Sequence, residues 1–414
     1  MPVPRLRPLD LIATQWNGRQ VVCARDYEGL LDSPVLLPVP VVAVALLLDG
    51  RREARDVQVE YARLTGGELL PSWELDRIIR DLDAHGLLDS PALEARRREI
   101  AAAYRAAPHR AMAHAGLSYP ADPTALARTL RGYLDAGGDG APAGDGGCPP
   151  GILAPHIDFA RGGAMYGRAY RALGALPDGA CVVVLGVAHA APPTPYVLTR
   201  KGYETPFGVL DVDRPLLEAV AERCPFDALA HEPAHRAEHS IEFQALFLAY
   251  LARGRRITIL PVLTGSLDAL CGSGSPSSVP EIEAFIAALR AGIASLGRPV
   301  CVVGGVDLSH VGPRFGDAEP VGPRLAASAR ALDREALDRV AAGDAEGFWR
   351  VVAGDGNRRR VCGLGAIYTV LRVLEPVRGR ILGYDQGVDP AGGLVGFSAV
   401  VFGPAEVATR RPDG

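Results

Sequence analysis

The amino-acid sequence predicts an α/β fold, a mainly parallel or mixed sheet covered by helices, together with a small, mainly helical N-terminal domain. From residue 151 onward, continuous apolar and β-branched runs alternate with helical patterns, which is typical of strands buried on both faces of a sheet. Residues 1–108 lack this alternation. Three of the apolar runs end just before a histidine, namely His156, His189 and His310.

The composition narrows the class of protein. The chain has 414 residues, of which 48% are hydrophobic, so it can bury large cores. A formal net charge of -4 without a long basic block argues against a nucleic-acid-binding surface. The seven cysteines are scattered, no signal peptide is visible, and the most apolar run, Val35 to Leu48, is too short to span a bilayer. We therefore expect a cytoplasmic protein that is not embedded in a membrane.

The N-terminal domain is expected over residues 1–108. Helix starts are predicted at Pro38, where a missing N–H group costs little, at Ala54, and at Ser72, which can cap a helix. A short strand near Leu88 and a connecting helix over Pro91–Ala107 follow. Together these elements predict a winged-helix-like module. The pattern resembles the PqqD-like domains that escort peptides to radical enzymes, which implies a peptide client; the alternative is a plain helical dimerisation or packing module.

The second domain is expected over residues 112–405. A helix is predicted over Leu126–Leu134, and the Gly-, Ala- and Pro-rich stretch Gly137–Pro150 predicts a flexible surface loop. Strands are expected at residues 151–154, 181–186, 257–263, 299–305, 378–384 and 394–402, and helices at 163–174, 214–222, 239–252, 280–296, 323–342, 344–353 and 363–374. In such sheets ligands bind outside the carboxyl ends of the strands, which is where the three histidines fall.

The three strand-end histidines predict a shared site. Neutral imidazole is the commonest metal ligand in proteins, and three histidines at equivalent strand ends favour one site over three structural roles. The spacings of 33 and 121 residues between His156, His189 and His310 match no short zinc motif, so they leave the metal open. His231 and His235 lie on a polar stretch and are expected at the surface.

Three further positions carry candidate chemistry, each with a structural alternative. Asp307 can orient His310 as a base, or cap the following turn. In the segment Glu238-His239-Ser240-Ile241-Glu242 the acids can cap a helix, or Glu238 and His239 can line a site as proton-transfer or supporting groups. Cys362 precedes a helix whose dipole favours its thiolate, so it can act as a nucleophile or soft metal ligand, or simply be a buried thiol.

Seven ordered motifs resemble those of the Memo family, over about residues 112–403: A-H-A-G-L-S-Y-P-A-D-P, A-P-H-I-D-F, L-G-V-A-H, A-E-H-S-I-E, I-T-I-L-P-V-L-T-G, V-D-L-S-H-V-G and V-C-G-L-G-A. The chain is similar to the B proteins of systems that also contain an AMMECR-type protein and a radical SAM protein. This implies that those two proteins are partners. It also implies a fold similar to that of class III extradiol dioxygenases.

The resemblance also implies roles at the crevice. His156, His189 and Cys362 occupy the metal-ligand positions, and His310 occupies the position of a catalytic histidine. The dioxygenases use a carboxylate as third ligand, so Cys362 puts ring cleavage in doubt. A thiolate is a softer ligand than a carboxylate, which favours iron(II) or copper(I). A thiolate can also be oxidised. Ala190 is a second departure, because some relatives have another histidine there.

Three functions are compatible with these patterns. The first is a metal-dependent redox enzyme of unknown substrate, with iron(II) preferred over copper, in which His310 and Asp307 move protons and Glu238 and His239 line the pocket. The second is a non-catalytic adaptor that presents a peptide client, held by residues 1–108, to a radical SAM partner. The third is a hydrolase that uses a zinc-bound water, since zinc tolerates a cysteine ligand.

Overall fold

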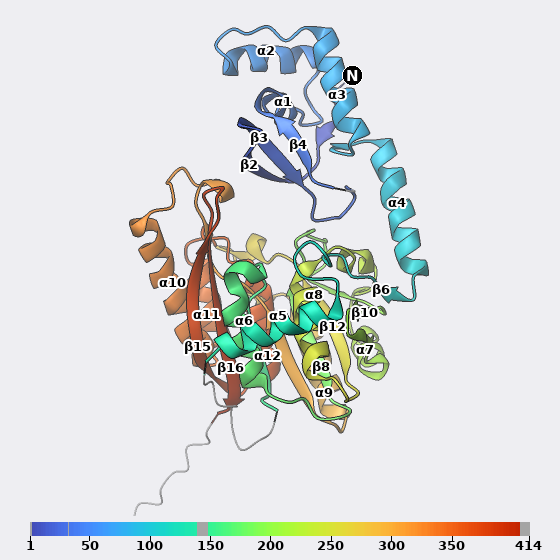
Figure 1. Cartoon of the computed structure of the whole chain (residues 1–414), viewed down its shortest axis with the longest axis vertical. Coiled ribbons are helices and arrows are strands. Elements are labelled where there is room, and N and C mark those ends of the chain that lie inside the picture. Colours follow the sequence, from blue (N-terminus) through green and yellow to red (C-terminus); the bar gives the residue numbers. More distant parts are fainter. Residues whose placement is uncertain (1, 32, 139–147, 406–414) are drawn as a thin grey trace, which may run out of the picture. The chain divides into compact units, whose positions relative to one another are not determined.

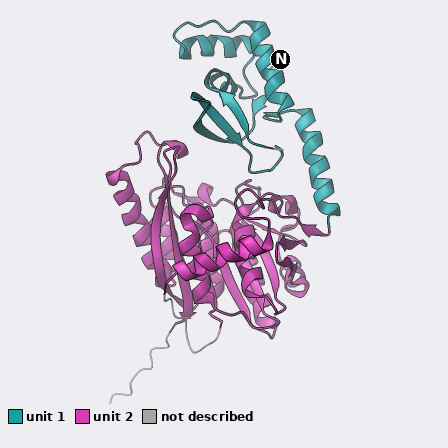
Figure 2. Cartoon of the chain, viewed as in Figure 1, with its two compact units in different colours: residues 1–107 teal, residues 108–414 magenta. Residues whose placement is uncertain are grey.

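The computed structural model describes residues 2–31, 33–138 and 148–405, and the chain divides into two compact units, Met1–Ala107 (unit 1) and Pro108–Gly414 (unit 2) (Figure 1, Figure 2). Each unit has a hydrophobic core of its own. Most of the loop predicted over Gly137–Pro150 lies outside the described residues. No helix of the described residues is long and apolar enough to cross a membrane.

Unit 1 contains a three-stranded antiparallel sheet that the sequence prediction missed. The sheet has the order β2 (Asp10–Trp16), β3 (Arg19–Arg25) and β4 (Val35–Pro38). Asn17 and Gly18 connect β2 to β3 with φ angles of 49° and 73°, the conformation that two-residue hairpin turns need. The apolar run Val35–Leu48 is divided between β4 and the helix predicted to start at Pro38, because its first residues pair with β3.

The helices of unit 1 lie close to their predicted positions. They are α1 (Val39–Ala45), α2 (Ala54–Leu64), α3 (Ser72–Ala84) and the connecting α4 (Pro91–Ala106), and the short strands β1 (Arg5–Leu6) and β5 (Leu88–Asp89) pair with each other. Their apolar faces meet in one core that includes Val57, Leu75, Ile78 and Leu82. That this module is a winged-helix-like or PqqD-like domain stays a prediction.

Unit 2 is built on an eleven-stranded mixed sheet, which confirms the predicted fold class. Its centre is parallel and has the order β7 (Gly151–Ala154), β13 (Val300–Gly305), β8 (Cys181–Val187) and β12 (Thr258–Thr264). On the other side of β7 the long strands β16 (Leu394–Pro404) and β15 (Val377–Val388) run antiparallel. The remaining strands were not predicted: β6 (His109–Arg110), β9 (Tyr196–Leu198), β10 (Gly202–Thr205), β11 (Gly208–Val212) and β14 (His310–Val311).

Helices cover both faces of the central strands. On one face lie α5 (Pro123–Ala136), α6 (Phe159–Leu173) and α8 (His239–Leu251); on the other lie α7 (Arg214–Ala221), α9 (Pro280–Ser295), α10 (Pro323–Ala341), α11 (Ala345–Ala353) and α12 (Leu364–Leu374). Strand β8 shows why its sequence is apolar throughout, because Val182 and Val184 pack into one cluster while Val183 and Leu185 pack into the other.

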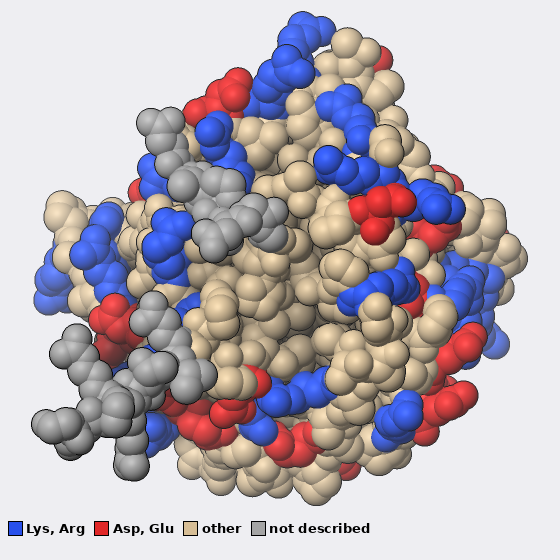
Figure 3. Space-filling model, turned by 90° about the horizontal axis from the view of Figure 1, so that it is seen from below, with Lys and Arg blue, Asp and Glu red and all other residues tan. Residues whose placement is uncertain are grey.

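The face of the molecule seen in Figure 3 carries basic and acidic side chains interspersed around uncharged areas, and no large area of this face has charges of one sign only. This distribution gives no support on that face to a nucleic-acid partner, whose backbone needs a basic surface.

Candidate metal centre

Three neighbouring parallel strands deliver the candidate side chains to one edge of the sheet. Strands β7, β13 and β8 pair in register, so their carboxyl ends lie together. His156 follows β7, Asp307 follows β13 and His189 follows β8. Cys362 comes from a different direction, on the loop before α12. The structure thus brings together residues that are far apart in the sequence.

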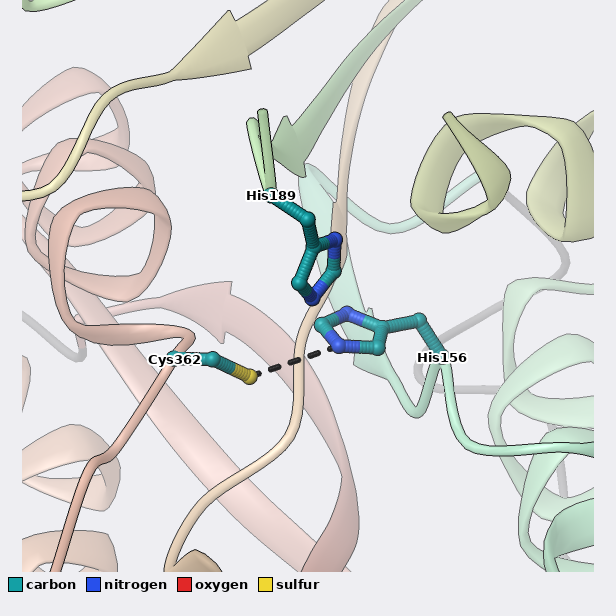
Figure 4. A group of neighbouring side chains, drawn as sticks. All are labelled: His156, His189 and Cys362. Carbon is teal, nitrogen blue, oxygen red and sulfur yellow. Dashed lines mark hydrogen bonds between the residues drawn. The ribbon is translucent and has the colours of Figure 1, made fainter. Parts of the chain in front are cut away.

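His156, His189 and Cys362 form a group that could hold a metal ion (Figure 4). One ligand atom from each of the three side chains lies within 4.8 Å of the other two. The Sγ atom of Cys362 is 3.3 Å from Nε2 of His156. The side chain of His156 is buried, whereas that of His189 is 17% exposed, so the group can be reached from one side.

The hydrogen bonds of both imidazoles prepare them for metal binding. Nδ1 of His156 donates to the carbonyl oxygen of Gly305 at 3.0 Å, and Nδ1 of His189 donates to the carboxylate of Glu238 at 3.0 Å. In each ring the Nε2 lone pair is then the one that can accept a metal ion. Two oriented imidazoles and one thiolate, three protein ligands in all, fit a catalytic type of site for zinc, iron or copper.

Glu238 has the helix-capping role that the sequence offered, and it also contacts His189. It is the N-cap of α8, since its carboxylate accepts from the backbone N–H of Ser240 at 2.8 Å. The same carboxylate accepts from the backbone and the ring of His189. Burial alone would raise the pKa of Glu238, but the charge and hydrogen bond of His189 hold it well below its ordinary value. The carboxylate of Glu238 is therefore ionised where it accepts the hydrogen bond from the ring of His189.

Replacing Glu238 with glutamine is expected to weaken metal binding by roughly 10–100-fold, the usual effect of losing a group that orients a ligand. The amide can still accept from Ser240, so the start of α8 stays capped, but it no longer carries the charge that increases the basicity of His189. A competition titration with a chelator of known affinity measures the change. Affinity equal to that of the unmodified protein would show that Glu238 is only a helix cap.

Asp307 and His310 lie beside the group; the hydrogen bonds of each are made with other residues, while their charges act on each other. Asp307 accepts from the backbone N–H of His156 at 3.1 Å, and its other oxygen is 3.6 Å from Nε2 of the same residue. Burial raises the pKa of Asp307 to about 6 and lowers that of His310 to about 4. Nδ1 of His310 donates to the carbonyl of Leu308 at 2.9 Å, so the backbone sets its tautomer. That Asp307 orients His310 stays a prediction.

His239 and His114 extend the histidine cluster behind His189. The ring of His239 stacks on that of His189 with centroids 4.8 Å apart, and its Nδ1 atom is 3.3 Å from Glu238. Burial lowers the pKa of His239 well below its ordinary value. The sequence analysis did not assign His114, whose ring meets that of His239 edge-on at 5.8 Å. The A-H-A-G motif that contains His114 was the signal in the sequence that could have identified it.

A buried ion pair that the sequence analysis missed holds this cluster in place. The guanidinium of Arg110 pairs with the carboxylate of Glu242, and both side chains are fully buried. Arg110 also donates to the carbonyl oxygens of His235 at 2.9 Å and Glu238 at 2.7 Å. Glu242 accepts from the hydroxyl of Tyr119 at 2.5 Å and from backbone N–H groups of residues 113 and 114. Segment 110–119 is thereby fixed to the first turns of α8.

His235 is buried, which corrects the expectation that it lies at the surface. The polar stretch around it folds into a short 3₁₀ turn (Glu232–His235) beneath β9. Nδ1 of His235 accepts from the hydroxyl of Tyr203 at 2.9 Å, and Nε2 donates to the carbonyl of Val197 at 3.0 Å. The neutral ring is fully hydrogen-bonded, and burial lowers its pKa to about 3.

The free energy of unfolding is expected to fall as the pH is lowered from about 6.5 toward 3, because His235 takes up a proton in the unfolded chain but not in the folded one. This residue alone contributes up to about 1.4 kcal/mol per pH unit in that window. Urea unfolding at several pH values measures the slope, which His235→Asn should reduce. The control Tyr203→Phe removes the hydrogen-bond donor but keeps the imidazole, so it should keep the slope; an unchanged slope in His235→Asn contradicts the prediction.

The loop that carries Cys362 is anchored by two arginines. Arg359 is buried and donates to Asp333 at 2.8 Å, and its carbonyl accepts from the N–H of His310 at 2.6 Å. Arg360, with a φ angle of 52°, donates to the carbonyl of His310 at 3.1 Å. Burial raises the pKa of Cys362 well above its ordinary value, which is opposite to the lowering that the sequence suggested. A metal ion, which binds the thiolate, would have to displace that proton.

Known proteins of one family are similar to this chain over most of its length. The Memo-like protein family model matches residues 110–399. A MEMO1 family protein of Aquifex aeolicus is 29% identical over 96% of this chain and 99% of its own, and one of Thermus thermophilus is 32% identical over 85% of this chain and 99% of its own. A MEMO1 family protein of Methanopyrus kandleri is 26% identical over 306 residues, a length close to that of unit 2 alone. The chain therefore belongs to the Memo-like protein family.

Proposed function

We propose that this protein is a metal-dependent redox protein that binds iron, or secondarily copper, through His156, His189 and Cys362. The observation that carries the proposal is the convergence of two pre-oriented imidazoles and one thiol within 4.8 Å. A thiolate beside two imidazoles is a softer donor set than one with a carboxylate, which suits iron(II) and copper(I). When bound, such an ion supplies one-electron chemistry and a position at which a substrate can bind.

The surrounding residues of the chain would hold and move protons. Neutral His310, whose Nδ1 proton is fixed on the carbonyl of Leu308, presents Nε2 as a proton acceptor. Asp307, with its pKa raised to about 6, can exchange a proton near neutral pH. Glu238 stays ionised and keeps His189 oriented, and the ring of His239 stacks on that of His189.

The test is anaerobic purification followed by metal analysis and then by O₂ uptake with and without a reductant. The proposal expects iron, or copper, near one equivalent per chain and O₂ uptake that depends on the reductant. Zinc at one equivalent together with hydrolytic activity that persists without O₂ would favour a zinc hydrolase instead. If the double variant His156→Ala, Cys362→Ala binds as much iron and copper as the unmodified protein, the site is assigned wrongly.

A second candidate function, an adaptor for a radical SAM partner in a system that also contains an AMMECR-type protein, rests on unit 1. This unit has its own core, and its strand β2 is an edge strand to which an extended peptide can add. The exposed Trp16 lies on that strand. Co-purification of full-length chain and residues 108–414 with the candidate partners is the test. An adaptor requires binding that is lost with residues 1–107, whereas equal binding by both forms excludes this role for unit 1.

A further inference from the structure

Two cysteine thiols outside the metal centre meet where strands β7 and β13 begin. Cys301 is buried within β13, and Cys148 lies just before β7 and is partly exposed. The backbone sets their proximity, because Val302 pairs with Gly151 and its N–H donates to the carbonyl of Pro150 at 2.9 Å. Cys148 packs against the apolar cluster that contains Cys301, and each of the two thiols shifts the pKa of the other.

The two thiols have unequal chemical character. The neighbouring Cys301 thiol lowers the pKa of Cys148 from its ordinary value, and Cys148 together with burial raises the pKa of Cys301 well above its own. A partly exposed thiol with a lowered pKa is the one that attacks an oxidant first, because the thiolate is the nucleophile. A buried partner in contact with it can then resolve the oxidised product.

We propose that Cys148 and Cys301 form a reversible disulfide when a peroxide or a small disulfide reaches Cys148. With hydrogen peroxide, the Cys148 thiolate attacks the O–O bond, so Cys148 becomes a sulfenic acid and the leaving hydroxide takes up a proton to give water. The sulfur of Cys301 then displaces the sulfenic hydroxyl, which leaves as a second water, and the S–S bond forms. Overall two thiols lose two electrons and two protons, and one peroxide becomes two waters. A thiol reductant reverses the bond by exchange.

A third cysteine nearby serves as a matched control. Cys181 on β8 lies beside β13 and pairs with Val300, yet it packs in the cluster on the opposite face of the sheet. Burial raises its pKa strongly. Cys181 is therefore as buried as Cys301 but does not face Cys148, so it should take no part in the disulfide.

The disulfide would lie at the opposite end of the strands from the metal centre. His156 follows the end of β7, whereas Cys148 precedes its start. The disulfide itself should therefore leave His156, His189 and Cys362 in place and tie the start of β7 to β13. Because a cross-link between residues far apart in sequence restricts the unfolded chain, the oxidised protein should have a higher Tm that returns to its original value on reduction.

The test is oxidation of the full-length protein with about one equivalent of hydrogen peroxide, alkylation, and peptide mapping without reductant. Trypsin places Cys148, Cys301 and Cys181 on three different peptides, residues 132–161, 291–314 and 172–200. We expect one cross-linked species, 132–161 joined to 291–314, that disappears with dithiothreitol. Cys148 found as free thiol or as sulfinic acid, without that species, overturns the proposal.

The variants separate the roles of the two cysteines. Cys181→Ser should form the same cross-link as the unmodified protein. Cys301→Ser should lose it and accumulate sulfenic or sulfinic acid at Cys148, whereas Cys148→Ser, which alters a partly exposed side chain and so spares the core, should lose it without oxidation of Cys301. A cross-link of residue 148 to any other cysteine, or a Tm rise in Cys148→Ser equal to that of the unmodified protein, contradicts the assignment.

Discussion

Replacing Cys362 with alanine is expected to lower the affinity for iron and copper by more than about 100-fold. Loss of a group that merely orients a ligand already costs roughly 10–100-fold, and here a ligand itself is removed. The two imidazoles remain in place, because their hydrogen bonds to Gly305 and Glu238 do not involve the thiol. Elemental analysis after anaerobic purification, followed by competition titration, measures the loss.

Two companion variants sharpen this experiment. Cys224→Ala removes a partly exposed cysteine elsewhere in unit 2 and should leave the metal content unchanged. Cys362→Asp replaces the thiolate with a carboxylate and is expected to retain iron(II) while losing copper(I), because a carboxylate is the harder ligand. Iron and copper contents of Cys362→Ala that equal those of Cys224→Ala would exclude Cys362 as a ligand.

The second large effect is expected on stability. Replacing Arg110 with methionine should lower the free energy of unfolding by about 3–5 kcal/mol, because it leaves the carboxylate of Glu242 buried without its counter-charge. Arg110 also donates hydrogen bonds to the carbonyl oxygens of His235 and Glu238, and the substitution removes that donor from both. Urea unfolding at neutral pH measures the change, and lower metal affinity should accompany it because the start of α8 loosens.

The double variant Arg110→Met, Glu242→Leu is the control for this interpretation. Removing both charges takes away the unpaired carboxylate, so the double variant should be more stable than Arg110→Met alone. The hydroxyl of Tyr119 then loses its acceptor, which limits the recovery. A double variant that is less stable than both single variants would show that the attraction between the two charges exceeds the free energy needed to bury them.

The parts of unit 2 that could be predicted from the sequence are those with a long local signal. Strand β8 is apolar at every position because both of its faces are covered, and this continuous run located it, together with the histidine at its end. The third ligand position had no such signal. Cys362 lies on a loop held by arginines; its place before a helix left a nucleophile, a ligand and a buried thiol as alternatives, and only the ordered motifs of the family favoured the ligand.

The parts that could not be predicted depend on contacts between distant segments. Arg110 belongs to a two-residue strand, and its partner Glu242 is 132 positions away in the sequence. No periodic pattern therefore predicts the pair. His235 lies in a polar stretch whose composition suggests a surface loop, yet hydrogen bonds from Tyr203 and to Val197 allow the ring to be buried. In unit 1 the Asn17-Gly18 pair is a hairpin signal that was present in the sequence but was not used in the prediction.

The distribution of the ligands along the chain also determines when the metal centre becomes ordered. His156 and Cys362 are 206 positions apart, and each imidazole is already fixed through Nδ1 by a partner other than the metal. The conformational entropy of assembling the site is thus lost when the sheet folds, not when an ion arrives. In zinc fingers, by contrast, folding and metal binding are a single event. This centre is preorganised, so a chelator should empty it while the domain around it remains folded and ready to bind again.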